Sequence, residues 1–84
     1  ARLSADRYEG LCIKLLDLKK FPETEKWCQR LAQQHGNTLA AYTCRLKLYF
    51  TMGEREKFFQ VLDELKHSDV IIDNETLELI RIFS

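Results

Sequence analysis

The sequence has few residues that interrupt helices, with one proline and three glycines among its 84 residues. These residues separate stretches in which apolar side chains recur at positions i, i+3, i+4 and i+7, the spacing of one helix face. The alternation of apolar and polar residues that predicts a β-strand is missing outside the short segment 68–73. The sequence therefore predicts an all-α protein, with 68–73 as a linker whose apolar centre must pack or pair.

The chain also lacks an excess of either charge, because 13 basic residues balance 13 acidic ones. A balanced chain has no net positive field to attract nucleic acid. No segment approaches the roughly 18 consecutive apolar residues that span a membrane. We therefore expect no direct contact with nucleic acid or with a membrane.

Neither end of the chain has the features of a natural terminus. The sequence begins at Ala1 without a methionine or a signal-like apolar run, and it stops at Ser84 within an apolar pattern. Its length is that of one domain. We therefore expect residues 1–84 to form a single helical domain that belongs to a larger protein.

The three cysteines, Cys12, Cys28 and Cys44, are an odd number and include no CxxC pair. Small secreted domains usually carry an even set of cysteines in disulfides, and zinc sites commonly use CxxC pairs. All three cysteines fall on apolar stripes, where free cysteine behaves as a small buried hydrophobe. We expect three reduced core residues, no metal site and a reducing compartment.

Capping residues divide the chain into a hairpin at 4–36, a second hairpin at 37–68 and a final helix at 74–83. The residues expected at helix N-termini are Ser4 or Asp6, Pro22, Asn37 or Thr38, and Asp73 or Asn74. Gly36 is expected as a left-handed cap and Gly53 as the end of the third helix. His35 and His67 are expected to satisfy the last carbonyl groups of the second helix in each hairpin.

The apolar positions of the two hairpins align when the sequence is shifted along itself so that Tyr8 falls on Tyr42. The other aligned pairs include Cys12 with Leu46, Leu15 with Tyr49, Cys28 with Leu62, and Leu31 with Leu65. A helix–turn–helix unit of about 34 residues is the tetratricopeptide spacing, and the second unit supplies Tyr42, Tyr49 and Gly53 at motif positions. The sequence thus resembles the tetratricopeptide-repeat family, although Phe58 is bulkier than the family's small residue.

The resemblance implies two tetratricopeptide-like antiparallel helical hairpins plus a C-terminal capping helix, wound as a right-handed α-α superhelix. In that family the first helices of successive repeats line a concave groove. The groove positions carried over to this sequence are Glu9, Ile13, Leu16, Thr43, Lys47 and Phe50. Ile13 and Phe50 have two interpretations, because a partner or the neighbouring hairpin could cover them.

The family's clamp for a peptide carboxylate needs basic and amide side chains in the groove. Here Lys47 is the single basic residue at those positions, so a helix or an extended segment with apolar anchors fits better. The final helix is apolar over most of its circumference, and its candidate interface residues are Leu79, Ile82 and Phe83. They either plug the end of the solenoid or form a homodimer contact.

No glycine-rich phosphate loop, HExxH motif or nucleophile elbow is found in the sequence. We therefore expect a non-catalytic, cofactor-free protein–protein interaction module in the cytoplasm, which binds a peptide or helix of a partner in the groove. The hairpins and the final helix also resemble the bacterial transcriptional activator domain, which implies a regulatory or oligomerisation domain of a bacterial transcriptional regulator. An export or assembly chaperone is a third alternative.

Overall fold

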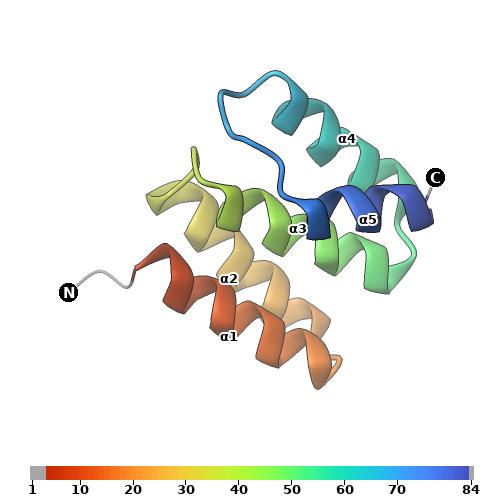
Figure 1. Ribbon diagram of the computed structural model, residues 1–84. Coiled ribbons are helices and arrows are strands. Elements are labelled where there is room, and N and C mark those ends of the chain that lie inside the picture. The colour runs from red at the N-terminus through yellow and green to blue at the C-terminus, as the bar shows by residue number, and fades with distance from the viewer. Residues whose placement is uncertain (1–3, 84) are drawn as a thin grey trace.

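The computed structural model describes residues 4–83, and Figure 1 shows their arrangement. The elements in order are α1 (Ala5–Asp17), α2 (Phe21–Gln34), α3 (Leu39–Met52), α4 (Arg55–Lys66) and α5 (Asn74–Phe83). No strand occurs within 4–83, so the prediction of an all-α protein is confirmed. None of these five helices has the length and hydropathy needed to cross a membrane. The terminal residues Ala1 and Ser84, which underlie the expectation of a larger protein, lie outside the described range.

The helices pack as neighbours along the chain, with α3 at the centre. α1 packs against α2, α3 packs against both of them, and α4 packs against α3 (Figure 1). The last helix, α5, crosses in front of α3. The two hairpins have the same spacing along the chain. The start of α3, Leu39, follows the start of α1, Ala5, by the same number of residues as the start of α4, Arg55, follows the start of α2, Phe21.

Two clusters of buried residues hold these helices together. The first contains Tyr8, Cys12, Cys28, Leu31, Ala41, Cys44 and Leu48, from α1, α2 and α3. The second contains Leu46, Phe58, Val61, Leu62 and Leu65, from α3 and α4. Tyr49 packs against both clusters, so the two hairpins share a continuous apolar interior. The linker contributes Val70 and Ile72 to the second cluster, whereas Ile71 between them is 86% exposed.

Several helices begin at predicted capping residues. The hydroxyl groups of Ser4 and Thr38 accept hydrogen bonds from the backbone N–H groups of Arg7 and Ala41. The carboxylate of Asp73 accepts one from the N–H of Thr76, at 2.9 Å. These contacts satisfy donors that have no partner inside a helix.

The helix C-termini confirm the prediction for Gly53 but not the prediction for Gly36. Gly53 ends α3 in the left-handed conformation, with φ of 75°. The prediction for Gly36 is wrong, because Gly53 is the glycine with positive φ and His35 occupies the C-cap of α2. A Cβ atom on Gly36 would lie 2.5 Å from the carbonyl oxygen of Ala32. A side chain at this position would meet the last turn of α2, which favours glycine there.

The expectation of three reduced cysteines is also wrong. Cys28 of α2 and Cys44 of α3 form a disulfide, while Cys12 of α1 is a free thiol. All three are buried, as predicted. Burial, together with the negative charge of Glu9, raises the pKa of the Cys12 thiol to about 11. Because disulfides persist mainly in oxidising compartments, the cysteines no longer support a cytoplasmic location.

Candidate functional site

The structure brings three of the six predicted groove residues, Glu9, Thr43 and Lys47, around one hollow. It lies where α1, α3 and the start of α5 meet, and its volume is about 190 Å³. We call it the acidic hollow, and it is lined by Asp6, Glu9, Leu39, Ala40, Thr43, Lys47, Asp73, Glu75 and Thr76. Side chains from helices far apart in the sequence therefore form a single concave surface.

A hydrogen bond joins the α1 and α3 walls of the acidic hollow. The Thr43 hydroxyl donates to a carboxylate oxygen of Glu9 at 2.8 Å, and it lies 3.2 Å from the carbonyl oxygen of Ala40. The bond to Glu9 is the shorter one and has a charged acceptor, which makes it the stronger contact. Thr43 is buried and Glu9 is half-buried, so the bond holds the carboxylate in a fixed orientation at the edge of the hollow.

An ion pair joins the α3 and α5 walls. The Nζ of Lys47 lies 3.3 Å from a carboxylate oxygen of Glu75. The Glu75 side chain is 76% exposed, so solvent screens this pair and its contribution to stability is small. Its main consequence is that Lys47, the basic residue of the described lining, already has an acidic partner.

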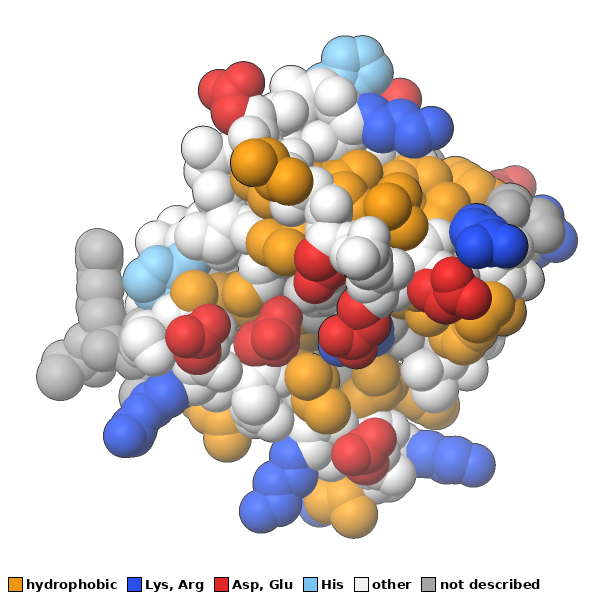
Figure 2. Space-filling model, viewed as in Figure 1, with side chains coloured by type: hydrophobic (Ala, Val, Ile, Leu, Met, Phe, Trp, Pro, Cys, Tyr) orange, Lys and Arg blue, Asp and Glu red, His pale blue; other side chains and the backbone are white. Residues whose placement is uncertain are grey.

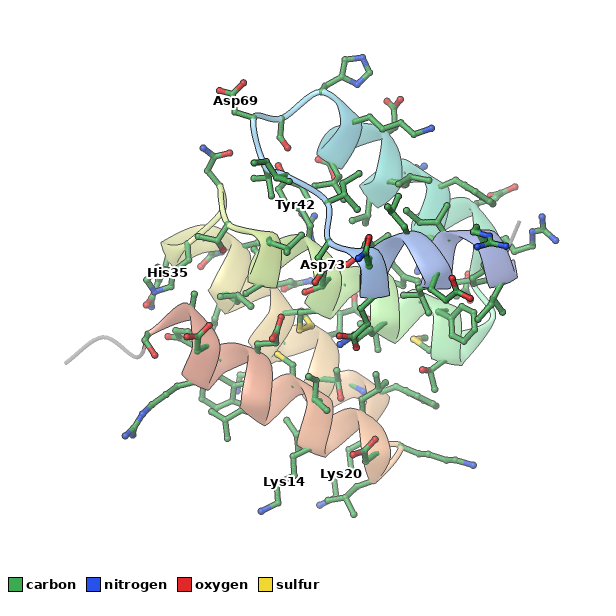
Figure 3. All side chains as sticks on the ribbon, in the orientation of Figure 1. Lys14, Lys20, His35, Tyr42, Asp69 and Asp73 are labelled. Atoms are coloured by element: carbon green, nitrogen blue, oxygen red, sulfur yellow. A yellow bond between two sulfur atoms is a disulfide. The ribbon has the colours of Figure 1, made fainter. Side chains whose placement is uncertain are left out.

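The start of α5 closes the hollow with a second fixed carboxylate, that of Asp73. Hydrogen bonds from the side chain and backbone of Thr76 lower the pKa of the Asp73 carboxyl, and the positive charge of Lys47 adds a smaller effect. Asp73 therefore carries its negative charge throughout the neutral range. Figure 3 places it at the junction of the linker and α5, in front of α3.

The described lining of the acidic hollow carries four carboxylates against one ammonium group. The acidic residues are Asp6, Glu9, Asp73 and Glu75. Acidic side chains gather across the middle of this face, with hydrophobic surface above and below them (Figure 2). A concave surface with one sign of charge attracts groups of the opposite charge. The hollow is therefore suited to an ammonium or guanidinium group.

The other three predicted groove residues do not line the hollow. Ile13 and Leu16 are half-buried on α1, and Leu16 packs against the first cluster. Phe50 packs against the second cluster, and its ring meets that of Phe83 edge-on, with centroids 5.1 Å apart. The chain's own α5 therefore covers Phe50, in agreement with the core interpretation of this residue.

The candidate interface residues of α5 divide between interior and surface. Leu79 and Phe83 pack against the second cluster, and the centroid of the Phe83 ring lies 4.6 Å from that of Phe58. Ile82 points outward and is 66% exposed. A homodimer contact through α5 stays a prediction, and Ile82 is the one residue of the three that remains available for it.

Sequence reasoning missed the acidic residues that close the hollow. The sequence indicates Asp73 as a cap and assigns no role in binding to Asp6 or Glu75. Asp6 lies one helical turn before Glu9 on α1, whereas Asp73 and Glu75 become neighbours of Glu9 only because α5 crosses α3, which no local pattern specifies. Comparison with protein-family models, curated proteins and solved structures found no match for this chain.

Proposed function

We propose that this chain is a non-catalytic protein-interaction module whose acidic hollow binds a lysine or arginine side chain of a partner segment. The observation that carries the proposal is the convergence of Glu9, Thr43 and Lys47, predicted as groove residues, on one concave surface with an excess of carboxylates. The partner is a peptide or helix rather than nucleic acid, whose phosphates the carboxylates would repel.

The size and lining of the acidic hollow support a single long cationic side chain as its occupant. A volume of about 190 Å³ accommodates the end of one side chain but not a folded element. The apolar residues Leu39 and Ala40 contribute to the lining beside the carboxylates. Lysine and arginine combine an aliphatic stem with a charged end, so they match both parts of this surface. The fixed carboxylate of Glu9 is the expected acceptor.

The proposed architecture is tetratricopeptide-like, with α1 and α3 as the first helices of two stacked hairpins and α5 as a capping helix. The equal offsets of the helix starts support it, as does a hydrogen bond between Glu9 and Thr43, which occupy equivalent positions 34 residues apart. In this arrangement α5 covers the end of the groove nearest Phe50. The binding surface is then the remaining part, from the acidic hollow along α1.

The positions of the histidines support a non-catalytic role. His35 is the C-cap of α2 and His67 is the C-cap of α4, where its ring lies 2.8 Å from the Asp63 carbonyl oxygen. Neither residue lines the acidic hollow, and its described lining includes no cysteine or serine. The lining therefore supplies charge and hydrogen bonds without the histidine, cysteine or serine of the common nucleophile–base pairs, and its Thr43 hydroxyl is a buried contact between two helices.

Arrayed peptides that differ at one central position test this function. The central residue is arginine, norleucine or glutamate in otherwise identical sequences, so that only charge and shape change. We expect arginine peptides to bind, added salt to weaken them, and the Glu9→Gln variant to bind them about tenfold more weakly, as for loss of a charged hydrogen bond. Glu56→Gln, at an exposed residue of α4, is the matched control and should bind normally. Equal binding of the arginine and glutamate peptides, or no binding in any series, would refute the proposed function.

A further inference from the structure

The three cysteines meet at one point although they come from three different helices. Cys12, Cys28 and Cys44 are equally spaced along the chain and lie near the middles of α1, α2 and α3. Their three sulfur atoms all lie within 4.8 Å of one another. The disulfide between Cys28 and Cys44 appears as a yellow bond near the middle of the molecule (Figure 3). The packing that forms the first core cluster thus also gathers the sulfur atoms.

The spread of these sulfur atoms is close to that of a three-thiolate metal site. Zinc lies about 2.3 Å from a thiolate sulfur, so sulfur atoms that share one ion are about 3.8–4.0 Å apart. The sulfurs of this chain already fall within 4.8 Å. Opening the disulfide lets the Cys28 and Cys44 sulfurs separate to that spacing, and their Cα atoms, 6.0 Å apart, are on different helices.

The surroundings of the sulfurs shield a bound ion from solvent and disfavour reactive thiols. Each of the three cysteines is at most 2% exposed, and Leu31, Ala41 and Leu48 belong to the same buried cluster. Thiols in apolar surroundings are poor nucleophiles, so exchange between Cys12 and the disulfide is not favoured. Thiolate is a soft ligand that selects thiophilic metals. A divalent ion leaves less net charge inside the core than a monovalent ion would.

We propose that the reduced chain binds one thiophilic divalent metal ion, of the zinc class, through the thiolates of Cys12, Cys28 and Cys44. In the oxidised chain the Cys28–Cys44 disulfide occupies two of the three ligands and prevents binding. The site joins α1, α2 and α3 in the first core cluster and is separate from the acidic hollow. It therefore makes metal content dependent on the redox state of the chain.

Reduction of the disulfide precedes metal binding. A dithiol reductant transfers two electrons to the Cys28–Cys44 disulfide, which becomes two thiols while the reductant becomes a disulfide. The metal ion then replaces the three S–H protons, which pass to solvent, and forms three metal–sulfur bonds. The resulting complex carries one net negative charge. Because metal binds the folded and not the unfolded arrangement of ligands, it stabilises the reduced fold.

The test uses the whole 84-residue chain, reduced with a non-metal-binding phosphine under nitrogen and titrated with Cd²⁺ or Zn²⁺. We expect one ion per chain by native mass spectrometry, a thiolate-to-Cd²⁺ charge-transfer band that saturates at equivalence, and a higher melting temperature. The oxidised chain should show none of these effects. Each single Cys→Ser variant removes a residue that binds the ion directly. Its affinity for the ion should therefore fall by more than the roughly 10- to 100-fold lost when a residue that only supports a ligand is changed.

A variant that weakens the core but keeps all three cysteines distinguishes a loss of metal affinity from a loss of stability. Leu48→Val, in the same cluster, should lower the melting temperature of the metal-free chain but keep the affinity of the wild type for Cd²⁺. If a Cys→Ser variant does not fold alone, the wild-type stoichiometry and the difference between its reduced and oxidised forms still decide the question. The proposal is overturned if the reduced wild type shows no saturable band, if the oxidised chain binds equally well, or if Cys12→Ser keeps full affinity.

Discussion

The hydroxyl of Thr43 donates a hydrogen bond to the carboxylate of Glu9 over 2.8 Å, although 34 residues separate the two in the chain. The bond connects the middle of α1 to the first turns of α3, on the face that carries the acidic hollow. It both ties the two hairpins together and fixes the carboxylate that we expect a partner to contact. Stability and binding at this face therefore depend on the same pair of side chains.

Thr43→Val tests the stabilising part of this pair. The substitution keeps the shape of a buried side chain and removes the hydroxyl that contacts Glu9, so the free energy of unfolding should fall by about 1.5–3 kcal/mol. Urea denaturation followed by circular dichroism measures the change. Thr51→Val is the control, because Thr51 is exposed and donates to the carbonyl of Lys47 within its own helix. An equal effect of both substitutions would show that the bond to Glu9 contributes nothing.

Phe50→Ser distinguishes a groove residue from a core residue. Phe50 packs against Phe83 in the second cluster, so the structure predicts a loss of about 2 kcal/mol in unfolding free energy, less than for a fully buried phenylalanine. Ile82→Ser, at a residue that is 66% exposed, should change stability by less than about 0.5 kcal/mol. Thermal melting of both variants provides the comparison. A melting temperature that is unchanged in Phe50→Ser would place Phe50 in an open groove instead.

Two glycines should respond to alanine in opposite directions. Gly10 lies inside α1, and a Cβ atom added there would meet no other atom within 4 Å, so Gly10→Ala should stabilise the fold by about 0.5–1 kcal/mol. Gly53 has φ of 75°, which alanine adopts only with strain, so Gly53→Ala should destabilise it by about 1–2 kcal/mol. Denaturant midpoints of the two variants give both values. Changes of the same sign would contradict the left-handed end of α3.

Asp73 should make the start of α5 sensitive to acid. Hydrogen bonds from Thr76 lower the pKa of Asp73 in the folded chain, so the folded state binds the proton less readily than the unfolded state. Its stabilising contribution is complete above the unfolded pKa, about 3.9, and is lost as the pH falls through the lower folded pKa. Asp73→Asn keeps a good capping residue without a charge that titrates. Between neutral pH and pH 3, the melting temperature should fall less steeply with pH in this variant than in the wild type. Equal slopes in the two proteins would exclude a stabilising role of the Asp73 charge.

Features that depend on neighbouring residues could be predicted from the sequence. The caps Ser4, Thr38 and Gly53 act within one helical turn, so local sequence is sufficient to identify them. The prediction for Gly36 is wrong although its contact is also local: α2 ends at His35, and Gly36 follows without a positive φ in close approach to the Ala32 carbonyl. The left-handed conformation of Lys19, with φ of 58°, has no signal in the sequence, because lysine does not favour that conformation.

The candidate site could be predicted only where it follows one helix face. Glu9, Thr43 and Lys47 could be identified because the resemblance to tetratricopeptide repeats implies groove positions on the first helix of each hairpin. Glu75 and Asp73 reach the same hollow only because α5 crosses α3, and no local pattern specifies that crossing. The pairing of Cys28 with Cys44 likewise depends on how α2 packs against α3.

The most direct test of the acidic hollow is a two-dimensional amide NMR titration of the whole chain with an arginine-centred peptide from the array. The account predicts saturable shifts concentrated at Glu9, Thr43, Lys47 and Thr76, with a midpoint at about tenfold higher peptide concentration in Glu9→Gln. Shifts centred instead on Ile82 and the outer face of α5, with Thr43 and Thr76 unmoved at saturation, would contradict it.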